Sequence, residues 1–217
     1  DVCSSDLAIH PYYISGKTKK PNLSLINYEN IFNDINYDVL IVTDKSLLNS
    51  ATLYKQYRES KSNYKVKIVT TEQIYNAMNA GTPDITAIRN YVQYLYKPTN
   101  LKALILWGDG HFDYRGIQFK QPNPVPAYQI PDEDEYSYSE IDRSYSTDDY
   151  FVWVEGDDNI PDLTVGRLPF NTDAEGQWIV EKIKKYEEGS ANDDWRTRVL
   201  LMADDGIGEY YDRDDHV

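Results

Sequence analysis

Between residues 38 and 110, short apolar runs alternate with stretches whose apolar residues recur at helical spacing. Residues 39–43 and 103–107 are apolar on both faces, as is typical of buried parallel strands, and residues 65–70 alternate in a strand pattern. Helices are predicted over residues 44–60, 71–79 and 83–97, the last ending before Pro98. This rhythm of strands and helices predicts an α/β fold, with a parallel sheet covered by helices on both faces.

The second half of the chain is less regular. Residues 111–148 are rich in proline, tyrosine and acid and predict a long loop. Strands are expected at residues 150–154, 163–168 and 198–203. Between the last two, Thr172 and Glu175 form a capping-box pattern that opens a helix, and Gly189 closes it. Residues 8–37 show no strong periodicity and are interpreted as a linker or the end of a preceding domain.

Charge excludes one class of function. The 217 residues carry 36 acidic against 22 basic side chains, a formal net charge of -14, which argues against nucleic-acid binding. The acid gathers at residues 132–158 and 204–215. Such clusters are usually solvated loops, and structural calcium sites are the alternative.

The single cysteine, Cys3, is the obvious candidate nucleophile. Residues 1–7, however, are also the in-frame translation of a common short-read sequencing adapter, so we predict that they are an assembly artefact. Without Cys3 the chain has neither a disulfide nor a thiol of its own.

Two predicted strands end in Asp-Gly, at residues 108–110 and 204–206. Chemistry in open α/β sheets lies beyond the carboxyl ends of the strands, so these carboxylates, together with His111, are candidates for a site. The simpler interpretation is that glycine allows a tight turn while aspartate accepts hydrogen bonds from nearby backbone amides. One functional hypothesis is therefore an unrelated doubly wound hydrolase that uses Asp109 and His111. Phosphate-binding glycine loops and the Gly-x-Ser-x-Gly elbow are absent from the sequence.

Taken in order, several segments resemble the gingipain family of cysteine peptidases. They include the Gly-Asp-Gly strand end and the Val-Gly-Arg-x-Pro strand, and they occupy residues 37–43, 104–110, 146–151, 165–169 and 203–206. Within the family, the pattern is most similar to the sortase-like peptidases of the type IX secretion system. The resemblance implies a caspase-like (gingipain) fold of two α/β subdomains. Residues 38–190 would form the first, and residues 191–217 the truncated start of the second, catalytic one.

The resemblance also implies roles for residues near the carboxyl end. The family's catalytic His and Cys follow later strands, and the sequence has neither a Gly-His-Gly nor a cysteine after Cys3, so we expect this fragment to be inactive. Asp204, with Asp205 as the alternative, matches the acid that supports the catalytic His. Asp212 and Asp214 match the stretch that binds a basic substrate side chain. The best-aligned position there is Arg213, which puts strict arginine specificity in doubt.

The function implied is that of a cell-surface cysteine endopeptidase or sortase-like transpeptidase, located at the outer membrane of a Bacteroidetes-type bacterium. Its partners would be secreted proteins with C-terminal sorting domains and other type IX secretion components. No cofactor is required, although structural calcium is compatible with the acidic run. The alternative is a non-catalytic extracellular module of the same fold, which binds calcium or acts as a scaffold.

Overall fold

The predicted parallel sheet forms the centre of the molecule. The computed structural model describes residues 30–33, 36–113, 116–130, 145–156, 158–189 and 197–202. Its main sheet has the strand order β2-β1-β3-β6, with every neighbouring pair parallel. These strands are β1 (Val39–Thr43), β2 (Val66–Thr70), β3 (Ala103–Trp107) and β6 (Thr164–Leu168).

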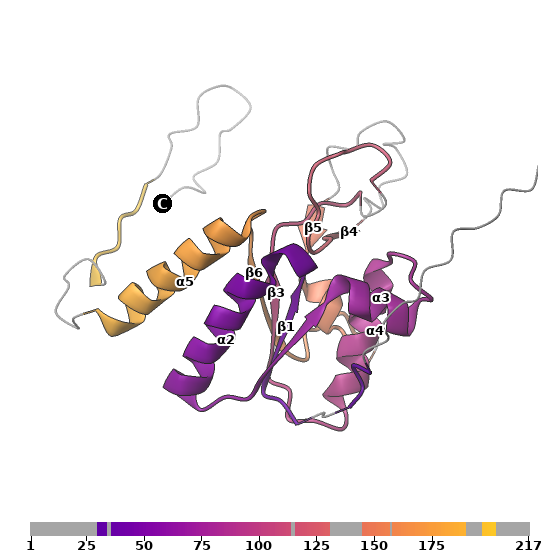
Figure 1. Cartoon of the computed structure of the whole chain (residues 1–217), viewed down its shortest axis with the longest axis horizontal. Helices are drawn as coiled ribbons and strands as arrows, with labels where there is room; N and C mark the ends of the chain where they lie inside the picture. Colours follow the sequence, from indigo (N-terminus) through magenta and orange to yellow (C-terminus); the bar gives the residue numbers. More distant parts are fainter. Residues whose placement is uncertain are drawn as a thin grey trace, which may run out of the picture.

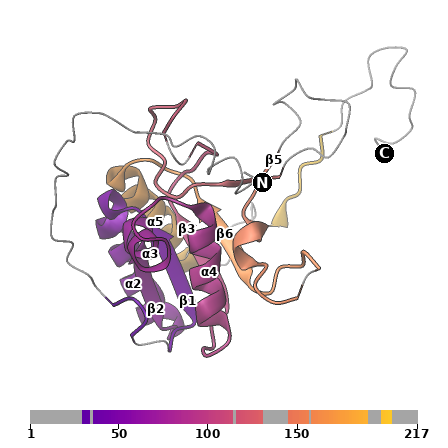
Figure 2. The same cartoon turned by 90° about the vertical axis from the view of Figure 1, so that its right-hand side faces the viewer.

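Helices cover both faces of this sheet (Figure 1). One face carries the short 3-10 helix η1 (Lys45–Leu47), α2 (Leu48–Ser62) and α5 (Asp173–Glu188). The other carries α3 (Thr71–Met78) and α4 (Ile85–Tyr96), which lie nearest the viewer in Figure 2. The α/β fold with helices on both faces is therefore confirmed. The predicted subdomain limits stay predictions, because residues 190–196 and 203–217 lie outside the described residues.

Local capping fixes where three of the helices begin. Thr70 accepts a hydrogen bond from the Gln73 backbone and completes a capping box at α3. Asp84 accepts a hydrogen bond from the Thr86 amide at 2.8 Å and caps α4. The capping box predicted at Thr172 and Glu175 is present at the start of α5. Each cap satisfies an amide that the helix itself leaves unpaired, so these boundaries follow from short-range sequence.

The core consists of two apolar layers, one on each side of the sheet. Successive strand residues point to opposite faces, so Leu40 and Leu106 pack toward α3 and α4 while Ile41 and Trp107 pack toward α2 and α5. Trp107 is fully buried, stacks on Tyr54 with ring centroids 4.9 Å apart, and donates its indole N–H to Ser50 Oγ at 3.0 Å. A strand that is apolar on both faces needs both helical layers.

Two predicted strands are wrong. Residues 149–152 form a 3-10 helix, η3 (Asp149–Val152), that packs on α4, where Arg89 donates to the Trp153 carbonyl and Gln93 to the Val154 carbonyl, both at 2.7 Å. These side chains satisfy backbone acceptors that a strand would have offered to a neighbour. Residues 198–202 have no strand partner among the described residues; Val199 to Met202 are 80–88% exposed.

The long loop holds a feature that the sequence did not predict. Strands β4 (Tyr128–Ile130) and β5 (Tyr145–Thr147) pair antiparallel as a separate two-stranded ribbon. In Figure 1 this ribbon lies beyond the end of the main sheet at which β1 leads into α2.

Gly176 on α5 tests the tightness of the packing between α5 and α2. A Cβ atom at this position would lie 2.5 Å from Ser50 Oγ and 2.7 Å from a ring carbon of Phe170. Overpacking of this kind costs about 1–3 kcal/mol, and the better helix propensity of alanine returns about 1 kcal/mol. We expect Gly176→Ala to lower the free energy of unfolding measured by urea titration.

Gly166→Ala is the matched control, because a Cβ at Gly166 in β6 would meet nothing within 4 Å. We expect it to leave the stability unchanged or slightly raised, since glycine in a strand is unfavourable. Equal stabilities for the two variants would contradict the predicted clash.

Candidate functional site

The carboxyl ends of the strands form the edge of the sheet where chemistry is expected. From β1 the chain first crosses to β2 on one side, and later returns to β3 and β6 on the other. The reversal makes a crevice between the ends of β1 and β3, the position at which open α/β sheets bind ligands. Asp44 follows β1 at this edge, and Gly108 and Asp109 follow β3.

The Gly-Asp-Gly strand end is a tight turn. Gly108 has a φ of +139°, and a Cβ on Gly110 would lie 1.9 Å from the Val125 carbonyl oxygen. Asp109 accepts hydrogen bonds from the Gly110 amide at 2.9 Å and from Asn171 Nδ2 at 3.2 Å. Its backbone amide donates to the Phe170 carbonyl at 2.8 Å. The carboxylate therefore organises backbone, as the simpler interpretation of the sequence holds.

His111 is likewise part of the loop. Its Nδ1 accepts a hydrogen bond from the Asp113 amide at 3.2 Å, and its backbone bonds to Asn123 in both directions, at 3.0 and 2.9 Å. Its Nε2 is buried and has no hydrogen-bond partner among the described residues. None of the hydrogen bonds of the described residues joins His111 to Asp109, so the pair needed for the hydrolase hypothesis is not assembled.

Asp113 holds the next turn of this loop. Its carboxylate accepts hydrogen bonds from the backbone amides of Ile117, Gln118 and Phe119 at 3.0, 2.6 and 2.8 Å. These bonds, that from Phe119 foremost, lower the pKa of Asp113 below its ordinary value of 3.8. Asp113 is thus a structural carboxylate that stabilises the loop in its ionised form.

Arg167 ties the loop to the sheet. Its guanidinium forms an ion pair with Asp148, with Nη2 at 2.8 Å and Nε at 2.9 Å from the carboxylate. Nη1 donates to the carbonyls of Gly108 at 3.1 Å and Val125 at 2.6 Å. A planar guanidinium can serve several acceptors at once. One side chain therefore joins the end of β3, the loop near residue 125 and the start of η3.

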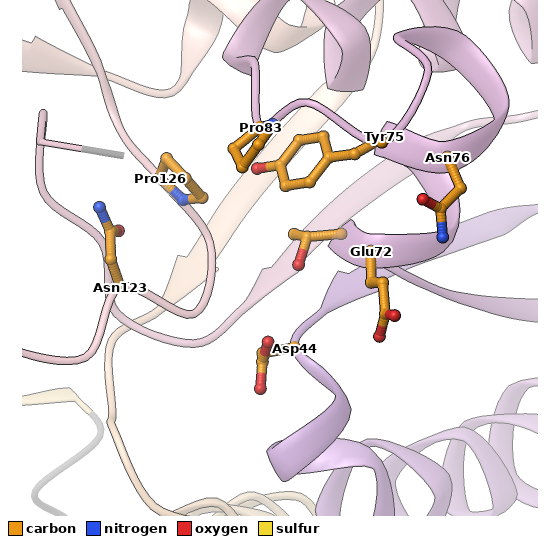
Figure 3. Close-up of a pocket in the computed structure, with 9 residues that line it drawn as sticks. Asp44, Glu72, Tyr75, Asn76, Pro83, Asn123 and Pro126 are labelled. Carbon is orange, nitrogen blue, oxygen red and sulfur yellow. The ribbon is translucent and has the colours of Figure 1, made fainter. Parts of the chain in front are cut away.

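A cavity of about 320 Å³ opens at the same edge (Figure 3). The end of β1 contributes Asp44, and α3 contributes Glu72 and Tyr75 to its wall. The loop contributes Asn123 and Pro126 from across the opening. A smaller cavity of about 180 Å³ shares Asp44 and Asn123 with it and extends toward Asn171. Together the two cavities occupy the crevice at which the strand order reverses.

The site residues predicted by resemblance are not described. Asp204, Asp205, Asp212 and Asp214 lie outside the described residues, and so does Cys3. Their roles stay predictions.

Of the acidic run at 132–158, residues 132–144 and 157 also lie outside the described residues. Asp148, from the same run, is the partner of Arg167. Within the described ranges, no group of three His, Cys, Asp or Glu side chains could hold a metal ion. The helices that the structure describes include none long and apolar enough to cross a bilayer.

Sequence reasoning overlooked the cavity, and it used Arg167 only as part of the Val-Gly-Arg-x-Pro segment without seeing its role in the loop. Asp44 and Glu72 each stand within two residues of a strand end, which is a usable signal. Asn123 lies about fifty residues from Glu72 in a loop without periodicity, and nothing local to it indicates that the loop folds back over β1.

Arg167 generates a prediction about stability. Replacing it with methionine leaves Asp148 unpaired and the Gly108 and Val125 carbonyls without their donor. We expect the free energy of unfolding to fall by about 3 kcal/mol, the lower end for breaking a buried ion pair, because Asp148 keeps some contact with water. Lys184→Met, which breaks the exposed Lys184–Glu181 pair on α5, should cost less than about 0.5 kcal/mol. Similar losses in the two variants would refute a special role for Arg167.

Asp113 generates a prediction about pH. Its pKa is lowered in the folded chain, so its contribution to stability is present above pH 3.8 and is lost as the pH falls through the folded value. Asp113→Asn has no charge to lose. We expect urea titrations to show the wild type more stable near neutral pH, with the difference narrowing below about pH 4. A difference that stays constant with pH would contradict this assignment.

Comparison with known proteins agrees with this fold. The sequence model of Peptidase family C25 matches residues 32–216. No curated protein matches the sequence significantly. Among solved structures, latent dimeric PorU from Porphyromonas gingivalis is 27% identical with a TM-score of 0.61, over 77% of this chain and 17% of the PorU chain.

The complex of RgpB pro- and mature domains from the same organism is 12% identical with a TM-score of 0.47, over 68% of this chain and 28% of that chain. The chain thus spans less than a third of either protein it resembles. The caspase-like fold class and the relation to PorU predicted from the sequence are confirmed. The chain belongs to Peptidase family C25, the gingipain family of cysteine peptidases.

Proposed function

We propose that this chain forms the first α/β subdomain of a cell-surface cysteine endopeptidase or sortase-like transpeptidase. The whole protein would process the C-terminal sorting signals of proteins exported by a type IX secretion system. One observation carries the proposal: the similarity to PorU over 77% of the chain, at 27% identity. The family match over residues 32–216 supports the peptidase class.

The chemistry proposed is nucleophilic. A cysteine thiolate attacks the substrate carbonyl, the peptide bond breaks, and the amine leaves with a proton from the histidine, so that a thioester acyl-enzyme forms. Water or an amine then attacks this thioester and releases the cysteine thiolate. The chain has no cysteine other than Cys3. The thiol and the histidine of the whole protein would therefore come from sequence that this chain does not contain. Asp204 would orient the imidazole and stabilise its charged form, with Asp205 as the alternative.

The described residues would support the catalytic centre without taking part in the reaction. The rim residues Asp109, His111 and Asp113 are engaged with loop backbone, and Arg167 fixes the loop to the sheet. Such groups hold a scaffold rigid, and a catalytic constellation on a rigid scaffold keeps its geometry. Asp212 and Asp214 would contact the substrate, and the protein would act at the outer membrane with other secretion components. Calcium, where present, would be structural.

The test compares the chain with the full-length protein encoded by its gene. We expect the purified 217-residue chain to show no cleavage of fluorogenic peptides that carry sorting-signal sequences. The full-length protein should cleave them, and Asp204→Asn should lower its kcat by roughly 10²–10⁴-fold, as loss of a positioned acid–base partner does.

Asp109→Asn is the control that separates the hypotheses. Because Asp109 holds backbone in the described structure, the variant should melt at a lower temperature and keep its kcat once folded. Turnover by the 217-residue chain, or a loss of kcat on Asp109→Asn without one on Asp204→Asn, would overturn the proposal.

A further inference from the structure

Residues 30–33, from the stretch interpreted as a linker, pack on the core layer between the sheet and the helices α3 and α4. We propose that they act as a strap that fastens the preceding chain to the subdomain and opens while the sheet stays folded, with Lys67 as its lock. The inference goes beyond the proposed function. It concerns how the subdomain is joined to the chain ahead of it, whatever reaction the whole protein performs.

Lys67 is the residue that points to such a strap. It pairs in register with Leu40 of β1, so its side chain points, like that of Leu40, into the apolar layer that α3 and α4 cover. Lys67 is only 8% exposed. A buried ammonium is costly unless it meets hydrogen-bond acceptors. The strap supplies two of them, because Lys67 Nζ donates to the Ile31 carbonyl at 2.6 Å and to the Asn33 carbonyl at 3.1 Å.

The helix α4 supplies the rest of the binding surface. The buried Tyr91 hydroxyl donates to the same Ile31 carbonyl at 2.9 Å. Phe32 packs edge-on against Tyr91 and Tyr94, with ring centroids 6.1 and 4.9 Å apart. Ile31 itself is 5% exposed. One buried apolar side chain and two bonded carbonyls thus fix the strap in a defined place.

The strap is nevertheless separable from the sheet. Among the described residues, its hydrogen bonds to the subdomain come from the side chains of Lys67 and Tyr91. The backbone amides of Phe32 and Asn33 bond within the strap, to Asn30. Opening of the strap therefore breaks no backbone hydrogen bond of the sheet, and local openings of this kind require less free energy than global unfolding.

The seam between the strap and the subdomain is loosely packed. A cavity of about 260 Å³ follows it, lined by Asn30, Ile31 and Asn33 from the strap and by residues 67–69 of β2. The interiors of proteins leave few voids larger than a water molecule. The strap is therefore packed less tightly than the core beneath it, which favours its local release.

The competing structural explanation is that residues 30–33 are an inseparable part of the core, since Ile31 is buried as core residues are. They would then open only when the whole subdomain unfolds. The two explanations differ in whether the strap responds to a substitution independently of the sheet.

The experiment is limited chymotrypsin digestion of the 217-residue chain under native conditions, with the products identified by mass spectrometry. Cleavage after Phe32 reports opening of the strap. Cleavage after Trp107, which is fully buried in β3, reports unfolding of the sheet. When reclosing is fast, each rate follows the population of its open state. We expect cleavage after Phe32 to be the faster of the two.

Matched lysine variants test the lock. Lys67→Met keeps the stem and removes the ammonium that donates to two strap carbonyls. We expect cleavage after Phe32 to accelerate by about 10- to 100-fold, as for the loss of a hydrogen bond to a charged group. Cleavage after Trp107 should stay unchanged, because methionine suits an apolar layer. Lys97→Met makes the same change at the exposed end of α4 and should alter neither rate.

A second pair of variants leaves the charge unaltered. Tyr91→Phe removes only the hydroxyl that donates to Ile31 and should accelerate cleavage after Phe32 by about two- to tenfold. Tyr94→Phe keeps the ring that packs on Phe32 and removes the hydroxyl of an exposed residue, so it should leave that rate unchanged.

Equal acceleration after Phe32 and after Trp107 in Lys67→Met would overturn the proposal, because the strap would then open only with the whole subdomain. So would cleavage after Phe32 that neither Lys67→Met nor Tyr91→Phe accelerates. If Lys67→Met fails to fold, the tyrosine pair decides, and equal rates for Tyr91→Phe and Tyr94→Phe refute the strap.

Discussion

Burial of β1 on both faces is the constraint on which the rest of the structure depends. Val39 to Val42 are at most 7% exposed, so apolar layers must cover the sheet from either side. Right-handed crossovers then place α2 on one face and α3 with α4 on the other, because the chain passes β1 on its way from β2 to β3. The reversal of strand order opens the crevice at the carboxyl edge. The two-layered core and the location of the crevice thus both follow from the burial of the same apolar strand.

The long loop after β3 lines part of that crevice. Its turns are fixed by Asp109 and Asp113, whose carboxylates accept backbone amides, and by Arg167, which reaches three segments from the edge strand. These polar groups occupy positions where enzymes of this architecture often keep reactive ones. The loop contributes Asn123 and Pro126 to the wall of the cavity that remains beside the end of β1 and α3. In the proposed peptidase, this subdomain would supply a rigid scaffold.

The segments on which the family resemblance rests contain residues that the fold needs. Gly110 allows a close approach of the Val125 backbone that a side chain would block, and Gly108 adopts a φ of +139° that favours glycine. Arg167 donates to the Gly108 and Val125 carbonyls. These positions belong to the Gly-Asp-Gly and Val-Gly-Arg-x-Pro segments on which the family resemblance rests. In the described structure these motifs therefore serve the architecture of the loop and of the sheet edge.

The sequence by itself determined the strands of the main sheet, most helix boundaries and the family. Buried strands, capping boxes and amphipathic helices follow from patterns within a few residues, so they can be recognised in the sequence. It misjudged the strand expected at residues 150–154, because residues 149–152 form a 3-10 helix that packs against α4.

Only the tertiary structure decided the Arg167 network and the cavity that Asp44 shares with Glu72 and Asn123. Their members come from segments tens of residues apart. Long-range packing, which no local pattern encodes, brings them together.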